Sequence, residues 1–249
     1  MNGDLKPKQR SADETSVDHL VLLISLLVVL LILPIFESLG ADRTIPFVGF
    51  NLILLTGVIL YRHKRLVFLP ALALFVIEVP LMWLTFFLDY ALLFVLTSIL
   101  ASGLFAALSI ALLVRVLQRH RAELQSLFGA VSAYLLLGLA WAVLYWAIDR
   151  TSTDAFAFNH RITIDYVHDS GETTAFSQFV YFSFVTMSTL GYGDISPRLA
   201  IVQTIAWLQA VVGQFYLAVA VAWLVNTLPN SSEKREKPER DERQSNAQG

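Results

Sequence analysis

A short run rich in glycine occupies positions 189 to 194 and reads Thr189-Leu190-Gly191-Tyr192-Gly193-Asp194. Because glycine adopts positive φ as readily as negative φ, the Gly-Tyr-Gly triplet can alternate the handedness of its backbone. An extended strand points successive carbonyls to opposite sides, whereas such alternation can turn them all to one side. The resulting row of carbonyl oxygens, ended by the Thr189 hydroxyl, is a set of hard ligands for a dehydrated cation. We expect Tyr192 to point away from this row and to wedge the strand against its surroundings.

These residues resemble the selectivity filter of the potassium channel family, whose signature is Thr-(Val/Leu)-Gly-Tyr-Gly-Asp. The resemblance implies a filter in which K⁺ binds to backbone carbonyls, namely those of Thr189, Leu190, Gly191 and Tyr192, with Gly193 completing the filter. One row of carbonyls cannot surround an ion and the sequence holds a single signature, so a ring needs several copies of the chain. By resemblance the assembly is a homotetramer with a four-fold axis. A Gly-Tyr-Gly turn in another kind of membrane protein is the alternative.

Residues around this motif depart from the family pattern in ways that suggest how the filter is supported. Leu190 replaces the commoner valine, which leaves the carbonyl available. Tyr181 and Phe182 stand where many relatives have paired tryptophans, one of which hydrogen-bonds the aspartate after the filter. Here we expect the Tyr181 hydroxyl to reach Asp194 instead. Val185 occupies a position where some members keep a buried carboxylate, so that type of filter regulation is not expected.

The composition is that of a membrane protein. Of the 249 residues, 56% are hydrophobic and 15% are charged, and the apolar residues form long runs. The net charge of −2 gives no indication of a nucleic-acid partner, and the absence of cysteine excludes disulfides, thiolate metal sites and a cysteine nucleophile. No nucleophile–base pair stands out, so we expect neither an enzyme nor a cofactor, with K⁺ only as the permeant ion.

The apolar runs predict an all-α membrane protein with six transmembrane helices, at about residues 19–36, 45–61, 66–88, 90–117, 127–148 and 199–226. The first run is longer than the apolar part of a typical signal peptide, and no Ala-x-Ala site follows it. Residues 175–188 are too few to span a bilayer and are expected to form a re-entrant pore helix. The polar residues 1–18 and 229–249 are expected to be disordered and cytoplasmic, and the tail is too short for a soluble regulatory domain.

The two halves of the chain resemble the two parts of a six-helix channel subunit. Residues 127–228 resemble the two-helix pore module, and residues 19–121 resemble the four-helix voltage-sensor arrangement. A voltage sensor needs several arginines at every third position within the membrane. The fourth span has only Arg115, near its end, and Arg119 and Arg121 follow it. We therefore expect a scaffold, or a sensor of something other than voltage.

The last apolar span carries Gly213, which matches the hinge glycine of the family in its distance from the filter. Glycine within a helix costs about 1 kcal/mol relative to alanine, and it permits either bending or close packing, so both interpretations stay open. The family's Pro-x-Pro bend is absent. By position, the residues expected to line and narrow the inner pore are Leu217, Val221, Ala222 and Val225.

The charges outside the spans predict the orientation. Bases gather on one set of connections and at the adjoining helix end, at Arg62, Lys64, Arg65, Arg115, Arg119 and Arg121. The positive-inside rule then places both termini in the cytoplasm of a cell, the protein in the cell membrane and the filter loop outside. The outer side is rich in acids, which either raise the local cation concentration or belong to ordinary solvated loops.

Two further features leave alternatives open. Glu78 is an acid deep within a span, and it is either a protonated carboxyl bonded to a neighbouring carbonyl or a lipid, proton or ligand site. The outer loop contains His160, Asp165, His168 and Asp169, which either bind a metal or sense pH, or are simply solvated.

Three rivals to the channel hypothesis remain. A secondary transporter would show an inverted repeat and broken helices, which are not apparent. A membrane enzyme would need a catalytic cluster in the spans. A subunit that only assembles with other channels would have little need of an intact filter motif.

Overall fold

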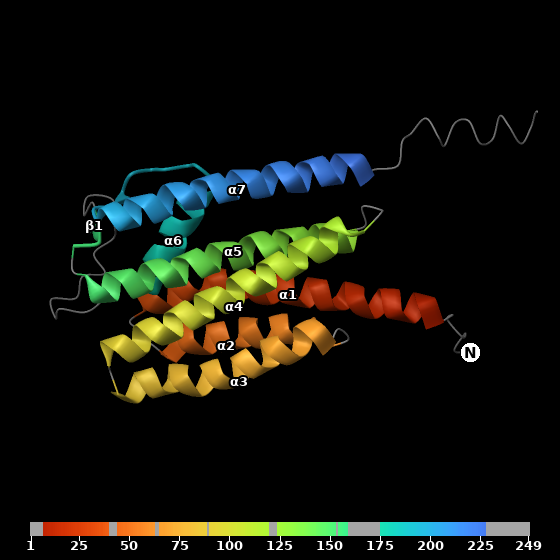
Figure 1. Cartoon of the computed structure of the whole chain (residues 1–249), viewed down its shortest axis with the longest axis horizontal. Coiled ribbons are helices and arrows are strands. Elements are labelled where there is room, and N and C mark those ends of the chain that lie inside the picture. Colours follow the sequence, from red (N-terminus) through yellow and green to blue (C-terminus); the bar gives the residue numbers. More distant parts are fainter. Residues whose placement is uncertain are drawn as a thin grey trace, which may run out of the picture.

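The computed structural model describes residues 7–39, 44–62, 65–88, 90–119, 124–152, 154–158 and 175–227. Within these ranges the chain is almost entirely helical, and two short strands pair with each other (Figure 1). The helices are α1 (Pro7–Ser38), α2 (Thr44–Ile59), α3 (Arg65–Leu88), α4 (Ala91–Leu117), α5 (Leu124–Thr151), α6 (Phe176–Met187) and α7 (Ala200–Thr227). The strands are β1 (Phe156–Phe158) and β2 (Ile195–Pro197).

Five of the described helices are long and apolar enough to cross a membrane: α3, α4, α5, α7 and the His19–Ser38 part of α1. The predicted all-α membrane fold is therefore confirmed. Helix α2 has 16 residues, which at about 1.5 Å each span about 24 Å, less than the hydrocarbon core of about 30 Å. The predicted count of six spanning helices stays a prediction for this reason.

The prediction of disorder for residues 1–18 was wrong over residues 7–18, because α1 already begins at Pro7. Helix elongation adds one hydrogen bond for each residue that is fixed, so a helix formed by the apolar run extends outward at little cost. No glycine or proline interrupts residues 8–18, and proline suits the first helical position. Residues 1–6 and the predicted tail lie outside the described residues.

Consecutive long helices run in opposite directions along the bundle. Figure 1 shows the beginning of α1 and the end of α7 at one end of it, with β1 at the other. The short helix α6 packs between α5 and α7, and α4 packs extensively along α5. The chain thus returns to its starting side after its last long helix.

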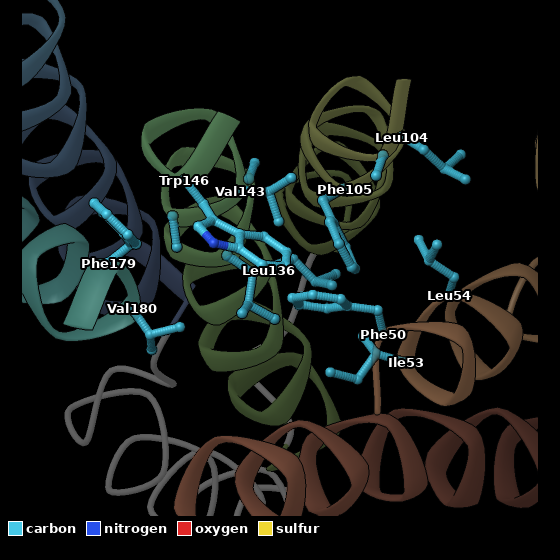
Figure 2. Packing of buried hydrophobic residues seen from close by; sticks show 14 of the residues in the cluster. Phe50, Ile53, Leu54, Leu104, Phe105, Leu136, Val143, Trp146, Phe179 and Val180 are labelled. Atoms are coloured by element: carbon cyan, nitrogen blue, oxygen red, sulfur yellow. The ribbon is translucent and has the colours of Figure 1, made fainter. Parts of the chain in front are cut away.

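One core joins the first four helices to the later part of the chain. Figure 2 shows Phe50 of α2, Phe105 of α4 and Trp146 of α5 pointing toward one another. The Phe50 ring lies 6.0 Å from Phe105 and 4.7 Å from Phe176 at the start of α6, both edge-to-face. The buried Ser109 hydroxyl of α4 donates to the carbonyl of Ala133 on α5 at 2.6 Å, and this bond joins the two helices.

Candidate functional site

The backbone after α6 alternates in handedness. Thr189, Gly191 and Gly193 have φ values of 60°, 56° and 77°, whereas Leu190 and Tyr192 between them do not have positive φ. Glycine accepts these values without strain, but for other residues the left-handed conformation costs about 1–2 kcal/mol. The alternation that the glycines predicted is present, and it extends one step further, to Thr189.

The last turn of α6 holds the start of this segment through backbone hydrogen bonds. The amides of Leu190 and Gly191 donate to the carbonyl of Val185, at 2.9 and 3.3 Å, and the Thr189 amide donates to Thr186 at 3.0 Å. Val185 therefore supports the segment through its carbonyl. Any displacement of this turn is transmitted directly to residues 189–191.

The predicted contact between Tyr181 and Asp194 is confirmed. The Tyr181 hydroxyl donates to Asp194 Oδ2 at 2.6 Å, and the other carboxylate oxygen accepts from the Ile195 amide at 3.0 Å. Desolvation and the bond to Asp194 both raise the pKa of Tyr181, so the hydroxyl stays a donor at neutral pH. The Tyr181 ring is parallel to that of Tyr192, with centroids 6.5 Å apart, so Tyr192 is turned toward α6.

Phe182 lies in a buried aromatic cluster. Its ring packs edge-to-face against Tyr145 of α5 at 5.0 Å and against Phe156 of β1 at 5.4 Å. Phe156 also contacts Phe179 one turn earlier on α6, at 5.3 Å. Tyr181 and Phe182, which were both predicted to support the filter, thus contact different parts of the molecule.

A two-stranded sheet fastens the segment after residue 194. Strand β1 pairs antiparallel with β2, with Phe156 opposite Pro197 and Phe158 opposite Ile195. Next to this sheet, the backbone amide of Arg198 donates to the carbonyl of Ala155 at 2.9 Å. Sequence reasoning missed these strands, because a strand of three residues is too short to show an alternating pattern. The two strands are also far apart in the sequence, since β1 precedes α6 and β2 follows it.

The first helix supports α6 from the other end. The Glu37 carboxylate of α1 accepts from the Ser177 amide at 3.1 Å, in the first turn of α6. The N-cap residue, Ala175, offers no side-chain cap. A carboxylate here satisfies an otherwise unpaired amide and faces the positive end of the helix dipole. In the sequence, Glu37 directly follows the first apolar run, and no local pattern there relates it to residues 176 and 177.

The comparisons with known proteins agree with this geometry. Residues 133–229 match the family model described as "Ion channel", and they include most of α5 together with α6, the alternating segment and α7. Protein LctB of Bacillus caldotenax is 30% identical over 140 residues, which cover 54% of this chain and 92% of LctB. This chain belongs to the ion channel family. No solved structure matches it.

In this channel chain, Gly213 provides close packing between α7 and α6. A Cβ atom at this position would lie 2.4 Å from the carbonyl oxygen of Met187, so only glycine fits without a backbone shift. The residues predicted to follow it along the pore are exposed in the single chain, at Leu217, Val221, Ala222 and Val225. Their pore-lining role stays a prediction.

The sequence left open the roles of Glu78 and of four outer-loop residues, and the structure describes only Glu78. Glu78 is fully buried in α3, and neither carboxylate oxygen has a hydrogen-bond partner among the described residues. The carbonyl bond that the sequence suggested for it is therefore not observed. The loop residues His160, Asp165, His168 and Asp169 lie outside the described residues.

Proposed function

We propose that this ion channel is selective for K⁺ and conducts it passively through a pore made by four copies of the chain. The observation that carries the proposal is the alternation of positive φ at Thr189, Gly191 and Gly193. This backbone supports a single row of ligands at the carbonyls of Thr189, Leu190, Gly191 and Tyr192. Oxygens in such a row can replace the water around a dehydrated cation.

The surface of the chain supports assembly into a tetramer within a bilayer. In the single chain, Leu190 and Tyr192 are exposed. Only 17% of the helix Ala200–Thr227 is buried, which leaves a long apolar surface for neighbouring copies and for lipid. One chain offers one row of carbonyls, so a closed site needs several copies around an axis.

The charges support a pore that is not strongly gated by voltage. Arg115 lies in the last turn of α4, donates to the Leu60 carbonyl at 3.5 Å and lies over the Tyr61 ring at 5.7 Å. It is the one basic residue of α4, so the helix lacks the several charges that a voltage sensor moves.

The same bases support an orientation with both termini in the cytoplasm. Figure 1 shows the connection after α2 and the end of α4 on the side where α1 begins and α7 ends. Arg62 and Arg65 flank that connection in the sequence, and Arg119 follows α4. Under the positive-inside rule the segment 189–194 faces out of the cell, and the protein resides in the cell membrane.

Flux measurements on purified protein in liposomes test this function. Vesicles loaded with K⁺ and diluted into an impermeant cation should develop an inside-negative potential that barium abolishes, and vesicles loaded with Na⁺ should not. A coupled transporter would instead develop this potential only when its second, coupled ion is also supplied. Equal potentials from K⁺ and Na⁺, or no potential from protein shown to be tetrameric, would contradict the proposal.

A further inference from the structure

Two successive turns of α7 contact two successive turns of α6. Gln209 meets Ser183, and Gly213, four residues later, meets Met187, four residues after Ser183. Residues four apart lie on the same face of a helix. The two contacts therefore form a continuous seam, which ends two residues before Thr189.

The contact between Gln209 and Ser183 belongs to a buried hydrogen-bond network that also includes Tyr145. Gln209 Oε1 accepts from the Tyr145 hydroxyl of α5 at 2.7 Å. Gln209 Nε2 donates to the Ser183 carbonyl at 3.0 Å and to Ser183 Oγ at 2.8 Å. Ser183 Oγ in turn donates to the carbonyl of Gly138 on α5 at 2.7 Å. Gln209, Ser183 and Tyr145 are all fully buried, and each of their side chains has a partner.

An amide in this position demands a defined geometry. Burying a polar group is unfavourable unless its hydrogen bonds are made, so rotation of α7 about its axis would leave Gln209 unsatisfied. A buried leucine would need no hydrogen-bond partner, so it would tolerate such a rotation of α7. The glutamine thus fixes the rotation of α7 relative to α5 and α6.

The network also lies close in sequence to Val185, which holds the start of the proposed filter, residues 189–193. Ser183 is two residues before Val185, whose carbonyl accepts from the amides of Leu190 and Gly191. A rigid turn of α6 links the two. A shift of Ser183 would therefore displace the Val185 carbonyl and, with it, the alternating backbone.

We propose that Gln209, together with Tyr145 and Ser183, is a positioning unit that sets the filter geometry and thereby the discrimination between K⁺ and Na⁺. The proposal rests on the K⁺ selectivity proposed above. Gln209 touches no permeating ion and acts through the last turn of α6.

Two conservative substitutions test the unit. Gln209→Met keeps the length of the side chain but removes its hydrogen bonds, and Tyr145→Phe removes one hydroxyl and keeps the ring. Tyr216→Phe is the matched control, because the Tyr216 hydroxyl also joins α7 to α5, at the Ala130 carbonyl, and has no hydrogen bond to α6 among the described residues. All three variants are measured as tetramers, for the K⁺/Na⁺ permeability ratio and for single-channel K⁺ conductance.

We expect the permeability ratio to fall by about tenfold in Gln209→Met and in Tyr145→Phe, which corresponds to about 1.4 kcal/mol. The Tyr216→Phe ratio should equal that of the wild type. Because Gln209 and Tyr145 belong to one network, the double variant should lose little more than Gln209→Met alone.

The outcomes separate the two proposals. A selective wild type with unchanged ratios in assembled Gln209→Met and Tyr145→Phe would overturn the positioning role. If Gln209→Met does not assemble, Tyr145→Phe decides alone. A non-selective wild type would instead contradict the proposed K⁺ function. An equal loss in Tyr216→Phe would show a general effect of α5–α7 contacts, and this too would overturn the specific role of Gln209.

Discussion

At Thr189 the backbone enters the left-handed region with a β-branched side chain, at φ 60°. Branching at Cβ makes this conformation less favourable than it is for most residues, so the neighbouring bonds must maintain it. The Thr189 amide is bonded to Thr186, and the next two amides are bonded to Val185. These bonds to the end of α6 therefore hold Thr189 in an unfavourable conformation.

Gly193→Ala tests whether the conformation of residues 189–194 is that of the proposed filter. Within the single chain nothing lies within 4 Å of the Cβ position, so φ 77° opposes the alanine there and a clash does not. We expect K⁺ selectivity or conduction to be lost while the tetramer still assembles. Gly103→Ala is the control, because Gly103 also has open space around its Cβ position but lies within α4 without positive φ. A wild-type permeability ratio in Gly193→Ala would contradict the filter assignment.

Tyr181→Phe tests the bond to Asp194. The ring can still stack on Tyr192, so only the hydrogen bond to the carboxylate is lost. Bonds to charged groups contribute about 1.5–3 kcal/mol, so we expect the steady-state K⁺ flux to fall about tenfold or more. Tyr90→Phe, at an exposed tyrosine before α4, is the control and should leave the flux unchanged. Equal fluxes in Tyr181→Phe and the wild type would show that the bond does not support conduction.

Helix α6 is held at both of its ends. Glu37 of α1 meets its first turn, and its last turn is bonded to residues 189–191. Between these ends, Phe179 and Phe182 pack against β1. The first helix therefore contributes directly to the position of α6, although it precedes the region matched by the ion channel family model.

Glu37→Ala tests this support from α1. Removal of a capping carboxylate typically costs about 1 kcal/mol, so we expect a lower melting temperature for the tetramer in detergent. Asp154→Ala is the matched control, because it removes an acid whose ion pair with Arg198 is exposed and worth little. If both variants melt at the wild-type temperature, the Glu37 contact does not stabilise α6.

In the whole molecule, the absence of an arginine ladder in α4 predicts weak voltage dependence. Open probability should change little between about −100 and +100 mV, because α4 carries a single basic residue and so cannot move several charges across the membrane field. Recordings from planar bilayers measure this directly. A steep conductance–voltage curve, equivalent to several gating charges per subunit, would overturn the scaffold interpretation of the first four helices.

The orientation of the channel is tested with one introduced thiol. The chain has no native cysteine, and Ser196 in β2 is exposed and lies opposite Ala157. Ser196→Cys in intact cells should react with an impermeant thiol reagent added outside. The matched position is Arg62→Cys, in the exposed connection after α2, which should react only after the membrane is opened. The reverse pattern would invert the proposed topology.

The sequence by itself determined the features that depend on local patterns. The length of each apolar run set the helices, so residues 175–188 were expected as a short helix and α6 occupies Phe176–Met187. The spacing of glycines predicted the alternating backbone, because only glycine enters the left-handed region freely. The disorder predicted for residues 7–18 failed because helix propagation depends on the neighbouring helix rather than on the polarity of the segment.

Only the tertiary structure decided which distant residues meet. Glu37 and Ser177 are 140 residues apart, and Tyr145 and Gln209 are 64 apart, so no local pattern reveals either contact. The two interpretations of Gly213 were also indistinguishable in the sequence, since both require the same missing Cβ. The structure favours close packing there because the Met187 carbonyl occupies the space that a side chain would need.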